Sequence, residues 1–256
     1  MRDVATLLEA LPYIREFHGK TVVIKIGGAA MTDAGLTHDF AQDIVLLRYV
    51  GLHPIVVHGG GPMITRMMER LGMDVKFVDG LRVSDSDTVD VAKMVLVGKQ
   101  NKDIVLSLNR HGQSAVGICG DDGQLFRVRK MPTAEDVELG FVGEIERVDV
   151  DLLNRISENY IPVIASVGAD VHGQSYNINA DEAASAVAEA MGAHKLMFLT
   201  DVVGWLHDAN DETSLISQAS AEQVRASLPT LGGGMRPKLA AAAQAVESGV
   251  SAAHII

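Results

Sequence analysis

The chain reads Thr21-Val22-Val23-Ile24-Lys25-Ile26-Gly27-Gly28 near its start, a β-branched run that leads directly into two glycines. The arrangement recurs as Val56-Val57-His58-Gly59-Gly60-Gly61-Pro62, which a helical pattern follows. Apolar β-branched runs are typical of buried strands, and a strand, a glycine loop and a helix in succession are typical of a βαβ unit. Ligands of open α/β sheets bind beyond the carboxyl ends of the strands. These two stretches therefore predict a parallel sheet with a ligand site at that edge.

The same alternation continues along the chain and predicts an α/β fold. Further strands are expected at 115–119, 161–166 and 195–200, and helices at 39–50, 63–71, 85–110, 151–159, 180–191 and 238–247. Helices that alternate with parallel strands cover both faces of the sheet. We therefore expect an open, mainly parallel sheet sandwiched by helices. Residues 120–148 contain Asp121-Asp122-Gly123 followed by the alternating Leu125, Arg127 and Arg129, a pattern typical of β-hairpins. We expect this segment to project from the sheet.

Composition narrows the classes of protein and of partner. The 256 residues carry a net charge of −11 with no cluster of Lys and Arg, which disfavours nucleic acid as a partner. No apolar run is long enough to span a bilayer. The chain begins Met1-Arg2-Asp3 and lacks the basic region followed by an apolar region that is typical of a secretory signal. The lone Cys119 excludes an intrachain disulfide. We expect a soluble cytoplasmic protein that binds no membrane, in which any anionic ligand needs a local cationic site.

Residues before the first strand predict an amphipathic helix that is kinked. Val4, Leu7, Leu8, Leu11 and Ile14 recur at helical spacing, and Pro12 lies within the pattern. Such a helix either packs on its own domain or exchanges between subunits, and periodicity does not choose between the two.

The glycine loops and Lys25 are candidates for phosphate binding. A lysine in an apolar strand needs an anionic partner, which is either a ligand phosphate or an internal carboxylate. Glycines let a backbone approach a ligand closely, although a three-glycine loop is also found in plain tight turns. The chain contains neither a Walker P-loop string nor a dinucleotide fingerprint, so phosphate binding would use another design.

Polar residues in two later loops suit a carboxylate or amide ligand. Ser84 resembles a helix N-cap, which places Arg82 on the preceding loop. There the Arg82 guanidinium either binds a ligand carboxylate through paired hydrogen bonds or forms an ion pair on the surface. Asp181 lies in a first helical turn, where the helix dipole alone explains a carboxylate, and Asn177 just upstream adds an amide.

A second glycine loop, Gly232-Gly233-Gly234, precedes Lys238 at the start of an Ala-rich helix. A cation at a helix N-terminus opposes the dipole unless an anion is present, which favours a functional role for Lys238. The histidines show no metal-ligand spacing, so no metal site is predicted. Cys119 lies in an expected buried strand and is read as inert packing.

Taken together, short motifs in a fixed order resemble the amino-acid kinase family, from about Leu7 to Ile256. They are Lys25-Ile-Gly-Gly, His58-Gly-Gly-Gly-Pro, Gly80-Leu-Arg-Val, Asn177-Ile-Asn-Ala-Asp, Thr200-Asp-Val-Val-Gly and Gly233-Gly-Met-Arg-Pro-Lys. Within the family the likeness is to enzymes that phosphorylate the side-chain carboxylate of N-acetyl-L-glutamate with ATP in arginine biosynthesis. The resemblance implies two lobes around a cleft, and Mg²⁺ carried by the nucleotide.

The resemblance also implies roles for individual residues. The catalytic group is two lysines that stabilise the transferring phosphoryl group and a carboxylate that orients them, namely Lys25, Lys238 and Asp181. The acylated amino acid contacts Gly60, Gly61, Arg82 and Asn177. The nucleotide contacts Gly27, Gly28, Thr200, Asp201, Gly204 and Lys238.

Three regions follow from the resemblance. Residues 1–18 form a kinked helix like that of arginine-inhibited members, which interlaces dimers into a hexamer built as a trimer of dimers. Residues 19–175 form the lobe for the acyl amino acid, and 176–256 the ATP lobe, in which relatives continue through a further helix and strand. Arginine as an effector and a PII signalling protein as a partner are implied by the same likeness, as is a homo-oligomer, hexamer or dimer.

Two alternatives to this function share the fold. Another amino-acid kinase, such as a glutamate 5-kinase or an aspartokinase, has the same phosphate machinery. A catalytically inactive ligand-sensing module has the same architecture, although retention of Lys25, Asp181 and Lys238 argues against it. Asp121 and Asp122 depart from the family, in which a lysine often occupies this turn.

Overall fold

The centre of the molecule is a parallel sheet. The computed structural model describes residues 2–256 except 28–30, 32, 79, 134–136 and 209–210. Six parallel strands lie in the order β12-β11-β1-β2-β8-β5. Their bounds are Thr21–Ile26 (β1), His53–His58 (β2), Ala115–Cys119 (β5), Ile161–Ala165 (β8), Lys195–Phe198 (β11) and Ala252–Ile255 (β12). The predicted parallel sheet is confirmed.

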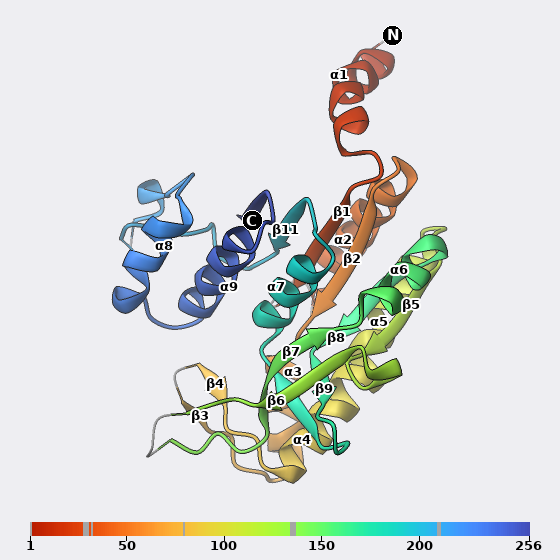
Figure 1. Cartoon of the computed structure of the whole chain (residues 1–256). Coiled ribbons are helices and arrows are strands. Elements are labelled where there is room, and N and C mark those ends of the chain that lie inside the picture. The colour runs from red at the N-terminus through yellow and green to blue at the C-terminus, as the bar shows by residue number, and fades with distance from the viewer. Residues whose placement is uncertain (1, 28–30, 32, 79, 134–136, 209–210) are drawn as a thin grey trace.

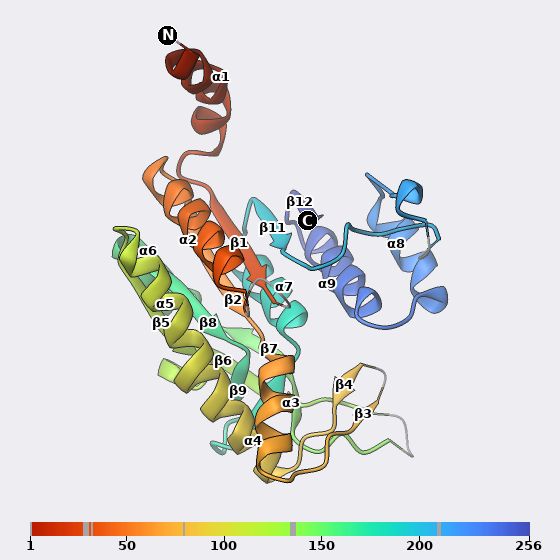
Figure 2. The same ribbon diagram turned by 180° about the vertical axis from the view of Figure 1, so that it is seen from behind.

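Helices cover both faces of the sheet, which confirms the predicted sandwich. Helices α2 and α5 pack on one face and α6, α7 and α9 on the other (Figures 1 and 2). The helices are Arg2–Phe17 (α1), Ala34–Tyr49 (α2), Gly61–Arg70 (α3), Ser86–Lys93 (α4), Asn101–Arg110 (α5), Val150–Asn159 (α6), Ala180–Ala190 (α7), Ala221–Ser227 (α8) and Met235–Glu247 (α9), with short 3₁₀ turns at Asp122–Gln124 (η3), Glu212–Ser214 (η4) and Leu228–Thr230 (η5).

The alternation of side chains along β1 divides the core into two halves. Val23 faces the layer of α6, α7 and α9, whereas Val22 and Ile24 face α2 and α5. Alanines line the contact between α7 and α9, so these two helices approach closely. The close approach brings the first turns of both helices to the carboxyl ends of the strands, where Asp181 and Lys238 lie.

A small closed barrel projects from the sheet, where the sequence predicted hairpins. It contains Phe126–Lys130 (β6), Val142–Val148 (β7), Val167–Ala169 (β9) and Ser175–Ile178 (β10), in the order β10-β7-β6-β9. The β6 and β7 strands form the expected antiparallel pair. A separate two-stranded ribbon, Phe77–Val78 (β3) with Leu81–Arg82 (β4), lies beside α3 and α4 (Figure 1).

The structure corrects two local predictions in the expected 85–110 helix. Between α4 and α5 lies a π-helical segment, Met94–Gln100 (η2), so the helix is not uniform. The N-cap is Asp85, whose Oδ1 accepts from the Thr88 N–H at 2.8 Å, and is not Ser84. The backbone N–H and C=O of Ser84 are both bonded to the 139–141 segment, so Ser84 belongs to a bridge and Asp85 is the first residue free to cap.

Cys119 lies at the end of β5 and is 4% exposed. Burial raises the pKa of its thiol to about 11, so the thiolate is scarce near neutral pH, in agreement with the predicted packing role.

Helix α1 stands apart from the rest of the molecule (Figures 1 and 2). It runs without interruption through Pro12 and exposes Leu8, Leu11 and Tyr13. Among the described residues, no helix combines the length and apolar character required to traverse a bilayer.

Candidate active site

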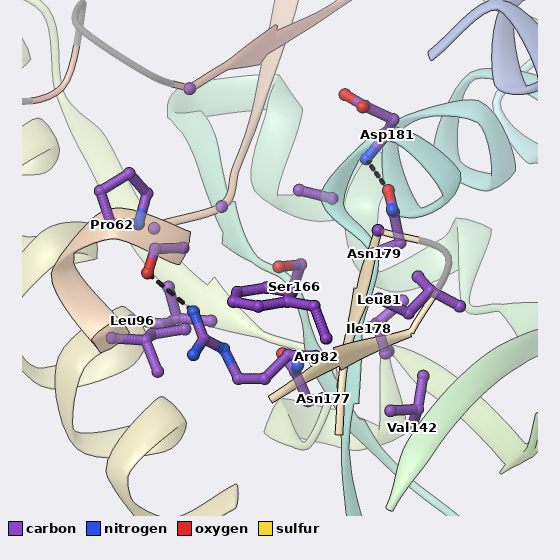
Figure 3. Close-up of a pocket in the computed structure, with 18 of the residues that line it drawn as sticks. Pro62, Leu81, Arg82, Leu96, Val142, Ser166, Asn177, Ile178, Asn179 and Asp181 are labelled. Carbon is purple, nitrogen blue, oxygen red and sulfur yellow. Dashed lines mark hydrogen bonds between the residues drawn. The ribbon is translucent and has the colours of Figure 1, made fainter. Parts of the chain in front are cut away.

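A cavity of about 250 Å³ opens at the carboxyl ends of the central strands, where the sequence placed a ligand site. In Figure 3, Pro62 and Leu96 lie on one side of it and Asn179 and Asp181 on the other. Its lining includes, among the predicted site residues, Lys25, Gly27, Gly60, Gly61, Arg82, Asn177 and Asp181. Residues predicted from separate motifs therefore share one cavity.

Asp181 joins the two predicted lysines. Its Oδ1 lies 2.9 Å from the Lys25 Nζ, and the Lys238 Nζ lies 3.4 Å from each carboxylate oxygen. Asn179 caps α7 by accepting from the Asp181 N–H at 2.8 Å, so the carboxylate of Asp181 is not needed as a cap. Lys238 is the fourth residue of α9, and Asp181 supplies the anion that its position near a helix N-terminus requires.

The charges of this triad leave a local excess of positive charge. Lys238 is 6% exposed; burial lowers its pKa, the Asp181 carboxylate opposes that shift, and the like charge of Lys25 adds to it. One carboxylate faces two ammonium groups, so the triad retains a net charge of about +1 next to the cavity. In a chain of net charge −11, this is the local cationic site that an anionic ligand needs.

The first turn of α3 presents backbone donors to the cavity. Gly60 is the N-cap, and no side chain caps this helix. Within the described part of the chain, the N–H groups of Gly60 and Gly61 donate to no other group. A Cβ on Gly60 would lie 2.6 Å from Leu96 Cδ2, and one on Gly27 would lie 2.8 Å from Lys25 Nζ, so a side chain at either position would displace Leu96 or the end of Lys25. An uncapped helix N-terminus with free N–H groups favours an anion.

Arg82 is buried without a carboxylate partner among the described residues. It is 6% exposed, donates to the Gly61 carbonyl at 2.9 Å and to Thr65 Oγ1 at 2.8 Å, and stacks on Phe77. Burial lowers the pKa of the guanidinium. The surface ion pair considered from the sequence is therefore wrong, and an uncompensated buried guanidinium is suited to a carboxylate ligand.

Several residues in or next to the cavity were not selected as site residues from the sequence. Asn177 Nδ2 reaches the Ser84 Oγ at 3.4 Å, so Ser84 helps to orient a predicted ligand residue. Ser166, which is 2% exposed, follows β8 at the same sheet edge. In the sequence, the feature that could have indicated Ser166 as a site residue is its position at the end of a buried strand. The apolar wall of Leu81, Leu96 and Val142 carried no signal, because apolar residues of the site and of the core are alike in sequence (Figure 3).

Of the predicted nucleotide residues, Gly27 lines this cavity, whereas Thr200, Asp201, Gly204 and Lys238 do not. Thr200, Asp201 and Gly204 follow β11, and the Thr200 N–H donates to the Ile256 carbonyl. Gly204 has a φ of 133°, which favours glycine. The Asp201 carboxylate raises the pKa of Lys238, so this loop lies near the triad. Gly28 is outside the described residues.

The chain belongs to the amino acid kinase family, whose profile matches residues 20–256. The acetylglutamate kinase of Symbiobacterium thermophilum is 51% identical over 98% of this chain and 89% of its own length. The acetylglutamate kinase of Brachyspira hyodysenteriae is 49% identical over 100% of this chain and 89% of its own length.

Solved structures show the same fold. An N-acetylglutamate synthase from Neisseria gonorrhoeae, complexed with coenzyme A and N-acetyl-glutamate, superposes with a TM-score of 0.87 at 25% identity, over 99% of this chain. The present chain spans only 57% of the length of that synthase. Carbamate kinase from Giardia lamblia bound to AMP-PNP superposes with a TM-score of 0.69 at 17% identity, over 93% of this chain and 92% of that one.

Glu182 adds a second carboxylate beside the triad. Burial, together with the nearby carboxylates of Glu144 and Asp181, raises its pKa to about 7. Between pH 4.5 and 7 the folded chain retains a proton that the unfolded chain has lost, so stability falls as the pH rises through this window.

We expect Glu182→Gln to raise the thermal unfolding midpoint at pH 8 and to leave it nearly unchanged at pH 4.5. The amide cannot ionise, so the variant avoids a cost of about 1–3 kcal/mol. Thermal unfolding followed by circular dichroism at both pH values measures the difference, with the exposed Glu189→Gln on the same helix as the control. An equal shift at both pH values would contradict the assignment of the raised pKa to Glu182.

Proposed function

We propose that this chain phosphorylates the side-chain carboxylate of N-acetyl-L-glutamate with ATP, giving N-acetyl-L-glutamyl 5-phosphate and ADP in arginine biosynthesis. The observation that carries this proposal is the identity of about half of all residues, across nearly the whole chain, to proteins named acetylglutamate kinase. The lysine–aspartate triad beside a glycine-lined cavity supports the same chemistry.

The proposed reaction needs positioned positive charge more than it needs a base. The acceptor carboxylate is already ionised near neutral pH, so its oxygen attacks the γ-phosphorus while the bond to the β–γ bridging oxygen breaks. Lys25 and Lys238 supply charge to the transferring group, and Asp181 holds both ammonium groups in place. The N–H groups of Gly60 and Gly61 add donors at the helix N-terminus.

Recognition of the acyl amino acid is assigned to the opposite end of the cavity. Arg82 binds the carboxylate that does not react, because its guanidinium is buried without a carboxylate partner among the described residues. Asn177, oriented by Ser84, offers an amide to the acylated nitrogen or carbonyl.

The nucleotide is assigned to Gly27, Gly28, Thr200, Asp201, Gly204 and Lys238. The excess positive charge of the triad and the free N–H groups fit a polyphosphate. In the part of the chain that the structure describes, no three His, Cys, Asp or Glu side chains form a metal site. Mg²⁺ is therefore assigned to the phosphate oxygens of ATP, where it would partly neutralise their negative charge.

The division into lobes is part of the proposal: residues 19–175 bind the acyl amino acid, residues 176–256 bind ATP, and 1–18 form the oligomerisation helix. The exposed Leu8, Leu11 and Tyr13 on the projecting α1 support a homo-oligomer, because burying such side chains contributes about 1.5–3 kcal/mol each. That the oligomer is a hexamer or a dimer, that arginine is an effector and that a PII signalling protein is a partner all remain predictions.

Substrate preference is the first test of this function. We expect a coupled ADP-release assay to give a kcat/KM for N-acetyl-L-glutamate at least ~10²-fold above those for L-glutamate and L-aspartate, since Arg82 and Asn177 are assigned to the acylated amino acid. Preference for an unacetylated amino acid would favour a glutamate 5-kinase or aspartokinase. No turnover with any of the three would favour the inactive ligand-sensing module.

The lysines are tested by single substitutions. We expect Lys25→Ala and Lys238→Ala each to lower kcat by roughly 10²–10³-fold, because each removes charge that acts on the transferring phosphoryl group. Lys99→Ala is the matched control, since its ammonium pairs with Asp103 on the surface. Steady-state rates near those of the parent chain for either active-site variant would refute the mechanism.

The α1 helix is tested by its apolar face. We expect Leu8→Ser combined with Leu11→Ser to reduce the oligomer size measured by sedimentation velocity, and we expect deletion of residues 2–17 to do the same. Glu9→Ser combined with Arg15→Ser changes exposed polar residues of the same helix and is expected to leave the oligomer intact. An unchanged sedimentation coefficient after the deletion would rule out a role in assembly.

A further inference from the structure

His58 is a fully buried imidazole immediately before the glycine loop. It ends β2 and is 0% exposed. Its Nδ1 lies 2.9 Å from the Gly59 carbonyl oxygen, and its Nε2 lies 3.1 Å from the Asn101 Nδ2. A buried polar ring requires partners, and here one of the partners is the backbone of the loop that lines the cavity.

The direction of each hydrogen bond in this network is determined from both ends. The Lys102 ammonium can only donate, so the Asn101 atom 3.0 Å from it is the accepting Oδ1, and the amide NH₂ faces His58. The His58 Nε2 therefore accepts, and the proton of the neutral ring is on Nδ1. The Gly59 carbonyl can only accept, which requires the same tautomer.

Other contacts keep Asn101 in this orientation. Its Nδ2 also donates to the Val163 carbonyl at 2.9 Å, and Gly117 leaves the space in which its Oδ1 lies, since a Cβ there would overlap the amide oxygen. Burial lowers the pKa of His58 to about 4, so the ring is neutral at physiological pH. The network thus has one arrangement near neutral pH.

The bond to Gly59 determines where the next N–H points. In a planar trans peptide the C=O and N–H directions are opposite. Because the Gly59 carbonyl is directed toward the His58 ring, the Gly60 N–H is directed away from that ring. Gly60 lines the cavity, and its N–H donates to nothing within the described part of the chain.

We propose that His58 and Asn101 are positioning residues for phosphoryl transfer, which hold the Gly59–Gly60 peptide so that the Gly60 N–H donates to the transferring phosphoryl oxygens. This inference rests on the proposed kinase function. Neither side chain lines the cavity, so both act through the backbone. A peptide that is free to rotate would lose part of the donor's contribution in the transition state, which lowers kcat more than it changes KM.

Two substitutions at position 58 separate this role from simple packing. Asparagine places an NH₂ group near the former Nδ1, so His58→Asn retains a donor to the Gly59 carbonyl and loses the contact to Asn101. Glutamine reaches the former Nε2, so His58→Gln retains an acceptor for Asn101 and loses the donor to Gly59. Both remove the ring, so a packing role predicts similar effects.

We expect His58→Gln to lower kcat by roughly 10–100-fold with KM for N-acetyl-L-glutamate within about 3-fold, and His58→Asn to retain at least a third of the parent kcat. Steady-state kinetics are compared below the unfolding midpoint of every variant. Equal losses in the two variants, or losses that follow their unfolding midpoints, would overturn the inference.

Asn101→Leu provides a second test with a similarly branched side chain. Leucine cannot donate to Nε2, so the ring is no longer held in the Nδ1–H tautomer and the hydrogen bond to the Gly59 carbonyl is weakened. We expect kcat to fall, but by less than in His58→Gln; a kcat equal to that of the parent chain would overturn the role of Asn101. A parent chain without activity on N-acetyl-L-glutamate would refute the proposed function instead, so the two failures are distinguishable.

Discussion

The contact on which the rest of the site depends is the shared carboxylate of Asp181, which holds Lys25 and Lys238 together. Two neighbouring ammonium groups, one buried and one partly buried, repel each other and are costly to desolvate, so both remain charged side by side only when an anion lies between them. Three elements must meet for this contact: the end of β1, the first turn of α7 and the first turn of α9.

The packing of the sandwich is what allows this meeting. Alanines at the contact of α7 and α9 bring their axes close, and the Ser185 hydroxyl donates to the Ala241 carbonyl between them. A larger residue there would separate Asp181 from Lys238 without touching either of them. The small side chains of these helices, which in sequence look only like good helix formers, therefore set the geometry of the charges.

The sequence predicted the features that depend on residues close together along the chain, but fewer of the features that depend on contacts between residues far apart in the chain. The strand at 21–26 and the glycine loop at 59–61 follow from local patterns, as does the resemblance that connects Lys25, Asp181 and Lys238. The burial of Arg82 and the use of Asp85 as the cap depend on contacts with α3 and with the 139–141 segment, which are distant in sequence. The tautomer of His58 likewise required Asn101, which lies on another element.

The position of β1 in the sheet has a consequence for synthesis of the protein. One edge of β1 pairs with β2, which follows it soon, but the other pairs with β11, which begins only at Lys195. At translation rates of about 5–20 residues per second, that second edge waits roughly 10–30 s for its partner on the ribosome. An unpaired apolar edge is open to wrong pairing throughout that interval. The strand that carries Lys25, a lysine proposed to act on the transferring phosphoryl group, is thus exposed to wrong pairing until β11 has been synthesised.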